Sequence, residues 1–263
     1  TWREKLLAAK EAGFDFVEIS IDETDAKLSR LDMTKEERLG LVRLMQETGV
    51  PIRTMCLSGH RKYPLGSSDP AVEARGIEIM EKAIRLAEDL GIRIIQLAGY
   101  DVYYEESTFE TKKRFLANLK KAADMAAKAG VTMGFETMEN EFMNTVEKAM
   151  KYVTLVGSPY LNVYPDIGNI TNAAKTYEND VLEDLELGKG HIVAMHLKET
   201  VPGKFREIPF GTGHVDFESA VTKAWELGVR KYVTEFWYTG NPGWKEDLTF
   251  ANEMFTRILN GRG

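Results

Sequence analysis

Apolar and polar residues follow one another in a repeating order: a segment with helical periodicity, then a glycine, then a short apolar run. The glycines that end these segments are Gly13, Gly49, Gly91, Gly130, Gly157, Gly190 and Gly228. The runs that follow them are FDFVEISI, VPIRTMCLS, IRIIQLAG, VTMGFET, SPYLNVYPDI, HIVAMHLKE and VRKYVTEFWY. Glycine accepts the left-handed backbone that ends many helices, whereas β-branched and aromatic runs favour strands. The pattern therefore predicts seven strands that alternate with helices.

Local signals support the helical segments between these runs. In TKKRFLANLKKAADMAAKAG the apolar residues of one helical face are Phe115, Leu119, Ala122 and Ala126. Their spacing is that of an amphipathic helix. The sequence TKEE at positions 34–37 is a capping box, and Asp69 followed by Pro70 indicates another helix start.

Strands that alternate with helices form parallel sheets with right-handed crossovers, which leaves a doubly wound open sheet or a (β/α)₈ barrel. No GxGxxG motif follows any of the seven runs, so the α/β barrel is favoured. A barrel of this class has eight strands, and the sequence opens directly on a helix. We therefore expect the first strand to lie before Thr1, and residues 1–263 to form a single catalytic domain.

Composition narrows the class of protein. The chain has 263 residues, a net charge of −7, and 34 basic residues without a basic stripe, which argues against nucleic acid and anionic membranes as partners. The single cysteine, Cys56, has no partner for an internal disulfide. The first residues resemble an amphipathic helix rather than a signal peptide, and no apolar run reaches the roughly 18 residues of a membrane span. We expect a cytoplasmic protein.

Four runs carry a polar residue at or near the strand end, where parallel barrels place their chemistry. These residues are Glu136, Asp166, His196 and Glu235. Each taken alone could be a helix cap, an ion-pair partner or a solvated loop residue, and the histidine could be a core residue. Burying all four without a cation would be costly, and oxygen ligands with one nitrogen suit Mn²⁺, Mg²⁺, Co²⁺ or Zn²⁺. The sequence therefore predicts a site for one divalent metal ion.

A second group of polar residues follows another strand, in LSGHRKYPLGSS. Ser58, His60, Arg61 and Lys62 combine a hydroxyl, an imidazole and two cations with glycine backbone amides, as a phosphate group requires. The alternative is a solvated surface turn.

The motifs that carry a resemblance to a known family are FDFVEISIDETDAKLSRLD, MCLSGHRKYPLGS, IRIIQLAGYDVYY, YPDIGN, HLKET and VPGKFREIPFGTGHVDF. Together they closely resemble the L-ribulose-5-phosphate 3-epimerases, also called L-xylulose-5-phosphate 3-epimerases, of bacterial L-ascorbate utilisation. The resemblance covers nearly the whole chain, although HLKE or DIGN alone occurs in many xylose-isomerase-like barrels. It implies a homodimeric barrel that begins with a strand before the first helix seen here.

The resemblance also implies roles for individual residues. Glu136, Asp166, His196 and Glu235 match the family's ligands of a divalent metal, and Glu136 and Glu235 match its acid/base pair. The implied reaction inverts carbon 3 of a ketopentose 5-phosphate, L-xylulose 5-phosphate or L-ribulose 5-phosphate, through an enediolate. The candidates for contacts to this substrate are Ser58, His60, Arg61, Lys62, Glu18, Asn169 and Lys198. For Glu18, a structural role is the alternative to hydrogen bonds with sugar hydroxyls.

Other functions remain open. An aldose–ketose or hydroxypyruvate isomerase on the same scaffold would share the enediolate, and a sugar-phosphate binding protein would bind without turnover. An endonuclease acting at abasic sites would need several zinc ions and a basic groove, and the acidic chain with four histidines argues against it.

Overall fold

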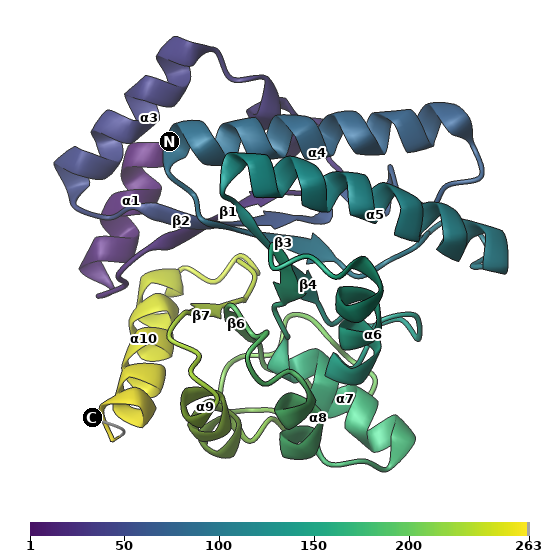
Figure 1. Cartoon of the computed structure of the whole chain (residues 1–263). Helices are drawn as coiled ribbons and strands as arrows, with labels where there is room; N and C mark the ends of the chain where they lie inside the picture. The colour runs from purple at the N-terminus through teal and green to yellow at the C-terminus, as the bar shows by residue number, and fades with distance from the viewer. Residues whose placement is uncertain (262–263) are drawn as a thin grey trace.

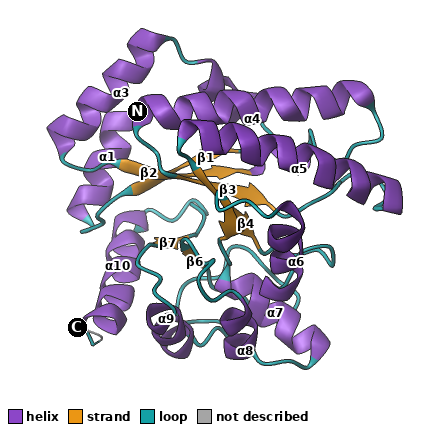
Figure 2. Cartoon of the chain, in the orientation of Figure 1, coloured by secondary structure: helices purple, strands orange, loops and turns teal. Residues whose placement is uncertain are grey.

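Seven parallel strands lie among residues 1–261, the part of the chain that the computed structural model describes (Figure 1 and Figure 2). They are β1 (Val17–Ile21), β2 (Ile52–Leu57), β3 (Ile94–Ala98), β4 (Thr132–Glu136), β5 (Leu161–Val163), β6 (Met195–Leu197) and β7 (Tyr232–Thr234). Each falls inside one of the seven runs predicted from the sequence. The prediction of seven strands is therefore confirmed.

Helices separate consecutive strands throughout. The α-helices are α1 (Trp2–Glu11), α2 (Asp25–Leu28), α3 (Lys35–Thr48), α4 (Pro70–Leu90), α5 (Phe109–Ala129), α6 (Val146–Val156), α7 (Ile167–Tyr177), α8 (Val181–Leu187), α9 (Phe217–Glu226) and α10 (Trp244–Asn260). Two 3₁₀ helices, η1 (Ser29–Asp32) and η2 (Ser58–Arg61), complete the described elements. None of the described helices is both long enough and apolar enough to cross a bilayer.

The predicted helix ends are present. All seven glycines have left-handed backbone, with φ between 65° and 91°. Thr34 and Glu37 form the predicted capping box at the start of α3, and Asp69 caps α4 ahead of Pro70. Local sequence therefore determines where these helices begin and end.

The strands follow chain order in space. β1 to β5 form one sheet, β6 pairs with β7, and isolated bridges at Val163–Ile192 and Asp166–His196 join β5 to β6. Among residues 1–261, no strand pairs with the outer edge of β1 or of β7. The expectation of an eighth strand before Thr1 stays a prediction.

The last three strands are shorter than the runs predicted for them, with three residues each. Pro159 and Pro165 flank β5, and proline has no N–H to donate to a neighbouring strand. Only two bridges connect β5 with β6, so the ladder is sparse here. The polar residues at these strand ends therefore occupy short strands and the loops that follow.

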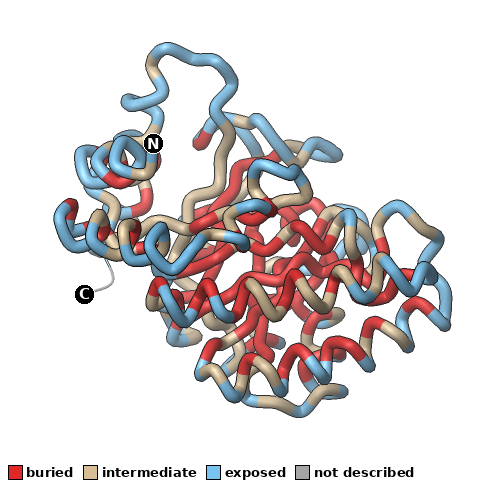
Figure 3. The backbone as a smooth tube through the Cα atoms, turned by 90° about the horizontal axis from the view of Figure 1, so that it is seen from above, coloured by how far each residue is buried: buried red, intermediate tan, exposed pale blue. Residues whose placement is uncertain are grey.

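Helices surround the strands and leave the core between the two layers. In Figure 1, α4 and α5 lie side by side along the β1–β4 sheet, and α6 to α10 surround β6 and β7. The predicted apolar face of α5 is buried against the sheet, with Phe115, Leu119, Ala122 and Ala126 at most 2% exposed. Figure 3 shows buried backbone at the centre and exposed backbone on the outer helices.

Candidate active site and metal centre

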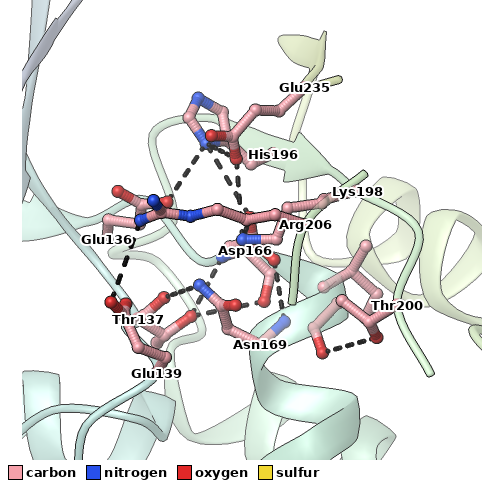
Figure 4. A network of polar contacts seen from close by, with 12 residues as sticks. Glu136, Thr137, Glu139, Asp166, Asn169, His196, Lys198, Thr200, Arg206 and Glu235 are labelled. Carbon is pink, nitrogen blue, oxygen red and sulfur yellow. Dashed lines mark hydrogen bonds and ion pairs between the residues drawn. The ribbon is translucent and has the colours of Figure 1, made fainter. Parts of the chain in front are cut away.

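The four predicted metal ligands lie together, although each comes from a different part of the chain (Figure 4). Glu136 is the last residue of β4, and Asp166 lies between β5 and α7, where its side chain also caps the helix. His196 is the central residue of β6, and Glu235 directly follows β7. One ligand atom from each side chain lies within 4.8 Å of the other three. Successive strands of the barrel thus bring the four residues to one point.

The ring nitrogen Nδ1 of His196 faces the three carboxylates. It lies 3.3 Å from Glu235 Oε2, 3.4 Å from Glu136 Oε1 and 4.0 Å from Asp166 Oδ2. The side chain of Asp166 is fully buried and that of His196 is 1% exposed, whereas that of Glu235 is 27% exposed. The cluster is therefore dry on one side and open to solvent at Glu235.

Two carboxylate oxygens of the cluster, Asp166 Oδ2 and Glu235 Oε2, are buried and face nitrogen atoms of His196 and Lys198. The ammonium of Lys198 is close to both, at 2.8 Å and 3.7 Å, and forms ion pairs with them. Buried carboxylate oxygens beside an imidazole nitrogen are a ligand set that suits a hard or borderline divalent cation. The residues present therefore fit the predicted metal.

The carboxyl groups differ in how readily they ionise. Burial raises the pKa of Asp166 to about 7, although Lys198 opposes the shift, and burial also raises the pKa of Glu136. For Glu235, burial acts in the same upward direction, but Lys198 and His196 outweigh it and hold its pKa below the ordinary value. Three neighbouring carboxyl groups thus have unequal affinities for a proton.

The other nitrogen of His196 has a different partner. Nε2 lies 2.7 Å from Oε1 of Glu18, which the sequence predicted as a substrate contact. Gln96, in the middle of β3, places its side-chain amide 3.5 Å from Nδ1. Sequence reasoning missed Gln96, although a polar residue inside the apolar strand IIQLA was a signal for it. The contacts to substrate predicted for Glu18 stay a prediction.

Asn169 and Lys198 both lie beside Asp166. The backbone N–H of Asn169 donates to Asp166 Oδ1 at 2.8 Å, and its side-chain amide donates to the backbone oxygen of Thr137 at 2.7 Å. Its Oδ1 is buried and has no hydrogen-bond partner among the described residues. One acceptor on Asn169 and the Lys198 ammonium are thus next to the candidate metal ligands.

The predicted phosphate loop forms η2 and the residue that follows. Ser58 is half-buried and Lys62 is exposed, with its ammonium 5.3 Å from the ring centre of Tyr63. His60 is buried, and its Nε2 lies 3.0 Å from the backbone oxygen of Gly76. Burial lowers the pKa of His60 to about 4, so its ring is neutral at pH 7. Its surroundings are those of a packed histidine that bonds to backbone.

Arg61 points toward the aromatic residues that follow β3. Its guanidinium lies 5.0 Å from the ring centre of Tyr103, donates to the hydroxyl of Tyr100 at 3.4 Å, and is 3.9 Å from Glu23. Its Nε–H is buried without a hydrogen-bond partner in the described part of the chain. Arg61 therefore retains an unused donor near the mouth of the barrel.

A second arginine approaches the same region and was missed by sequence reasoning. Arg206, in the loop after β6, lies 3.9 Å from Glu139, which also accepts a hydrogen bond from Tyr100 at 3.1 Å. Figure 4 places Arg206 and Glu139 beside the candidate metal ligands. The only signal for Arg206 was its charge in the motif VPGKFREIPFGTGHVDF, and no spacing rule relates it to Arg61.

An open cleft of about 970 Å³ reaches the cluster from the side of β1 and β7. Its lining includes Glu18, Cys56, His196 and Glu235. Burial and the neighbouring carboxylates raise the pKa of the Cys56 thiol, which keeps it protonated. The cleft runs along the outer edges of β1 and β7, where the predicted eighth strand would pair.

Two solved structures of similar fold are named as sugar 3-epimerases. A D-psicose 3-epimerase determined in the presence of D-fructose has a TM-score of 0.81 at 17% identity, and covers 98% of this chain and 94% of its own. A structure titled L-ribulose 3-epimerase has a TM-score of 0.75 at 22% identity, and covers 99% of this chain and 89% of its own. These likenesses establish the barrel fold that the sequence predicted.

Curated relatives are far more similar in sequence. The L-ribulose-5-phosphate 3-epimerases UlaE of Salmonella paratyphi C (strain RKS4594) and Escherichia coli (strain SMS-3-5 / SECEC) are each 51% identical over 237 residues. The alignments cover 90% of this chain and 82% of each relative. A sequence model described as xylose isomerase-like TIM barrel matches residues 6–254. The chain belongs to the xylose isomerase-like TIM barrel family and, within it, to the family of L-ribulose-5-phosphate 3-epimerases.

Proposed function

We propose that this protein is a metal-dependent L-ribulose-5-phosphate 3-epimerase that interconverts L-xylulose 5-phosphate and L-ribulose 5-phosphate. The observation that carries the proposal is the convergence of Glu136, Asp166, His196 and Glu235, each with one ligand atom within 4.8 Å of the other three. The 51% identity to relatives named for this reaction supports the substrate.

The four clustered residues are proposed to hold one divalent cation, of which Mn²⁺, Mg²⁺, Co²⁺ and Zn²⁺ are the candidates. The bound cation would supply positive charge that stabilises the enediolate. Lys198 adds a second positive charge at the site. Its ammonium forms ion pairs with Asp166 and Glu235. These positive charges lie where negative charge develops in the reaction.

Glu136 and Glu235 are proposed as the acid/base pair. Both lie close to His196 Nδ1, but they come from β4 and from the end of β7, with β5 and β6 between them. One carboxylate takes the proton from carbon 3, and the electron pair of that bond moves toward the carbonyl oxygen at carbon 2. The other group, in its acid form, then returns a proton to the opposite face of carbon 3. Inversion follows because the two groups act on opposite faces.

The phosphate group is proposed to bind at Arg61 and Lys62, with Ser58 and His60 from the same loop and Arg206 from the loop after β6. The unpaired Nε–H of Arg61 supports this site, since phosphate oxygens accept such donors well. Asn169 and Lys198 are proposed to contact the sugar hydroxyls, and for Glu18 a structural role beside His196 is the alternative to such a contact. The free Oδ1 of Asn169 could accept a hydrogen bond from one of these hydroxyls.

The remaining proposals concern the whole chain. We propose that residues 1–263 act as one catalytic domain and that the protein is a cytoplasmic homodimer in a pathway of L-ascorbate utilisation. The family resemblance supports the dimer and the pathway, and the single cysteine without a disulfide partner supports a reducing compartment. Light scattering after size-exclusion chromatography tests the dimer.

The function is tested by incubating purified protein, reconstituted with Mn²⁺, with L-xylulose 5-phosphate in deuterated water. We expect L-ribulose 5-phosphate that carries deuterium at carbon 3 from the first turnovers, because the acid exchanges with solvent separately from the base. Glu136→Gln and Glu235→Gln should each abolish net epimerisation. An aldopentose phosphate as product would favour the isomerase alternative, and retention of the original hydrogen at carbon 3 would refute the two-base scheme.

A further inference from the structure

His196 directs its two ring nitrogens at different carboxylates. Nδ1 faces the cluster of Glu136, Asp166 and Glu235, whereas Nε2 lies 2.7 Å from Oε1 of Glu18 on the opposite side of the ring. A neutral imidazole has one N–H and one lone pair, so only one of these nitrogens can bind a cation. The geometry assigns the lone pair to Nδ1 and the N–H to Nε2.

Glu18 is itself held in place. Its other oxygen, Oε2, accepts a hydrogen bond from the hydroxyl of Tyr164 at 2.9 Å, and its side chain is only 9% exposed. The Tyr164 ring also packs against the His196 ring, with centroids 4.9 Å apart and planes at 68°. Each oxygen of Glu18 therefore has a donor within the protein. The imidazole of His196 is held by its contact with Glu18 and by the ring of Tyr164.

We infer that Glu18 is a positioning residue, which keeps His196 in the tautomer and orientation that present the Nδ1 lone pair to the metal. A carboxylate that accepts the N–H of a ligating histidine fixes the ring and increases the basicity of the ligating nitrogen. The inference rests on the proposed metal site and goes beyond it, because Glu18 acts through His196. It also gives Glu18 a role that needs no contact with the sugar.

Metal affinity measured without substrate tests this role. Apoprotein is titrated with Mn²⁺ and the free ion is followed by electron paramagnetic resonance. Glu18→Gln preserves the shape of the side chain but removes its charge, and should weaken Mn²⁺ binding by about 10- to 100-fold. Tyr164→Phe keeps the ring packing and loses only the hydroxyl that holds Glu18, so its effect should be smaller but in the same direction.

Glu139→Gln is the matched control. It removes one negative charge near the same barrel mouth, but Glu139 contacts Tyr100, Tyr103 and Arg206 instead of His196. Its Mn²⁺ affinity should change much less than that of Glu18→Gln. An equal loss in both variants would show that Glu18 acts only through its charge, and would overturn the positioning role.

Nuclear magnetic resonance of the Zn²⁺-loaded protein detects the ring N–H of His196 directly. This signal would not change if Glu18 only stabilised the fold. The His196 ring should show its remaining N–H on Nε2, hydrogen-bonded in the wild type and shifted in Glu18→Gln. An N–H on Nδ1, or unchanged affinity in both Glu18→Gln and Tyr164→Phe, would overturn the inference while leaving the metal site intact. Absence of metal binding by the wild type would refute the proposed site itself.

Discussion

The two positively charged side chains predicted for phosphate have different surroundings. Arg61 lies between tyrosine rings, with a side chain 15% exposed and an Nε–H that lacks a partner in the described chain. Lys62 is exposed, and its ammonium lies over the ring of Tyr63. A buried guanidinium with an unused donor can form charge-assisted hydrogen bonds that exclude water, whereas an exposed ammonium is screened.

Arg61→Ala should therefore lose discrimination for the phosphate group. We expect the ratio of kcat/KM for L-xylulose 5-phosphate over free L-xylulose to fall by roughly 10- to 100-fold, the size of a lost charge-assisted hydrogen bond. Most of the loss should appear in KM. Lys62→Ala serves as the comparison and should change the ratio only a few-fold. An unchanged ratio in Arg61→Ala would remove Arg61 from the phosphate site.

His60 makes stability depend on pH. Its pKa is about 4 in the folded protein, against an ordinary value of 6.5, because the ring is buried. Between these values the unfolded chain binds more protons than the folded one, so stability rises with pH and is lost as pH falls from about 6.5 toward 4. His60→Gln keeps a donor for Gly76 but does not titrate.

Urea unfolding of the wild type and of His60→Gln at pH 7 and pH 4.5 measures this effect. The wild type should lose roughly 2 to 3 kcal/mol more than the variant between the two pH values. Equal losses in both proteins would mean that His60 is not kept neutral by burial.

Sequence reasoning predicted the four clustered residues because each lies at or near the end of a recognisable strand, and parallel strands place their carboxyl ends together. It missed Gln96 and Arg206. Gln96 reaches His196 from a strand 100 residues earlier, and Arg206 meets Glu139 only through the path of a long loop. Such contacts depend on how loops and distant strands lie in space, which no local spacing records.

Helix boundaries were predictable because their signals are local. Glycines in left-handed conformation and capping residues such as Thr34 and Asp69 act within one turn of the helix end. The lengths of β5, β6 and β7 were not predictable in the same way. A strand ends where its neighbour stops pairing, and that neighbour lies tens of residues away.

One helix end is satisfied by a residue from another helix. The carboxylate of Asp184, in α8, accepts hydrogen bonds from the backbone N–H groups of Val146 and Glu147 at 2.8 Å and 3.1 Å. These are free N–H groups of the first turn of α6, where a negative charge is also favourable. Asp184 therefore caps the start of α6 and also connects α8 to α6.

Asp184→Ala should lower the free energy of unfolding by about 1 to 2 kcal/mol, the usual cost of a lost cap. Asp184→Asn, which still offers one acceptor oxygen, should lose less. Both are measured by urea unfolding at pH 7. If Asp184→Ala is as stable as the wild type, Thr145, which accepts from the N–H of Lys148, is a sufficient cap for α6 alone.

The proposed cation would bind only the folded barrel, because its ligands come from β4, β6 and the segments after β5 and β7. Binding to the folded state alone adds about 2.7 kcal/mol of stability when the free ion is at 100 times its dissociation constant. Adding Mn²⁺ to apoprotein should therefore raise Tm. His196→Ala should fold but show little of this increase, and an equal increase in that variant would contradict the ligand assignment.

The long sequence separation within the site also determines when it can form. Glu18 and His196 are 178 residues apart, and the β1–β5 sheet and the β6–β7 pair must meet before the ligands converge. We expect contacts of such long range to form late in folding, because the loop-closure entropy is lost before these contacts stabilise the chain. A bound cation should therefore slow unfolding and leave the refolding rate unchanged, because the transition state does not yet contain the site. Metal would then govern how long the folded enzyme lasts, and not how quickly it forms.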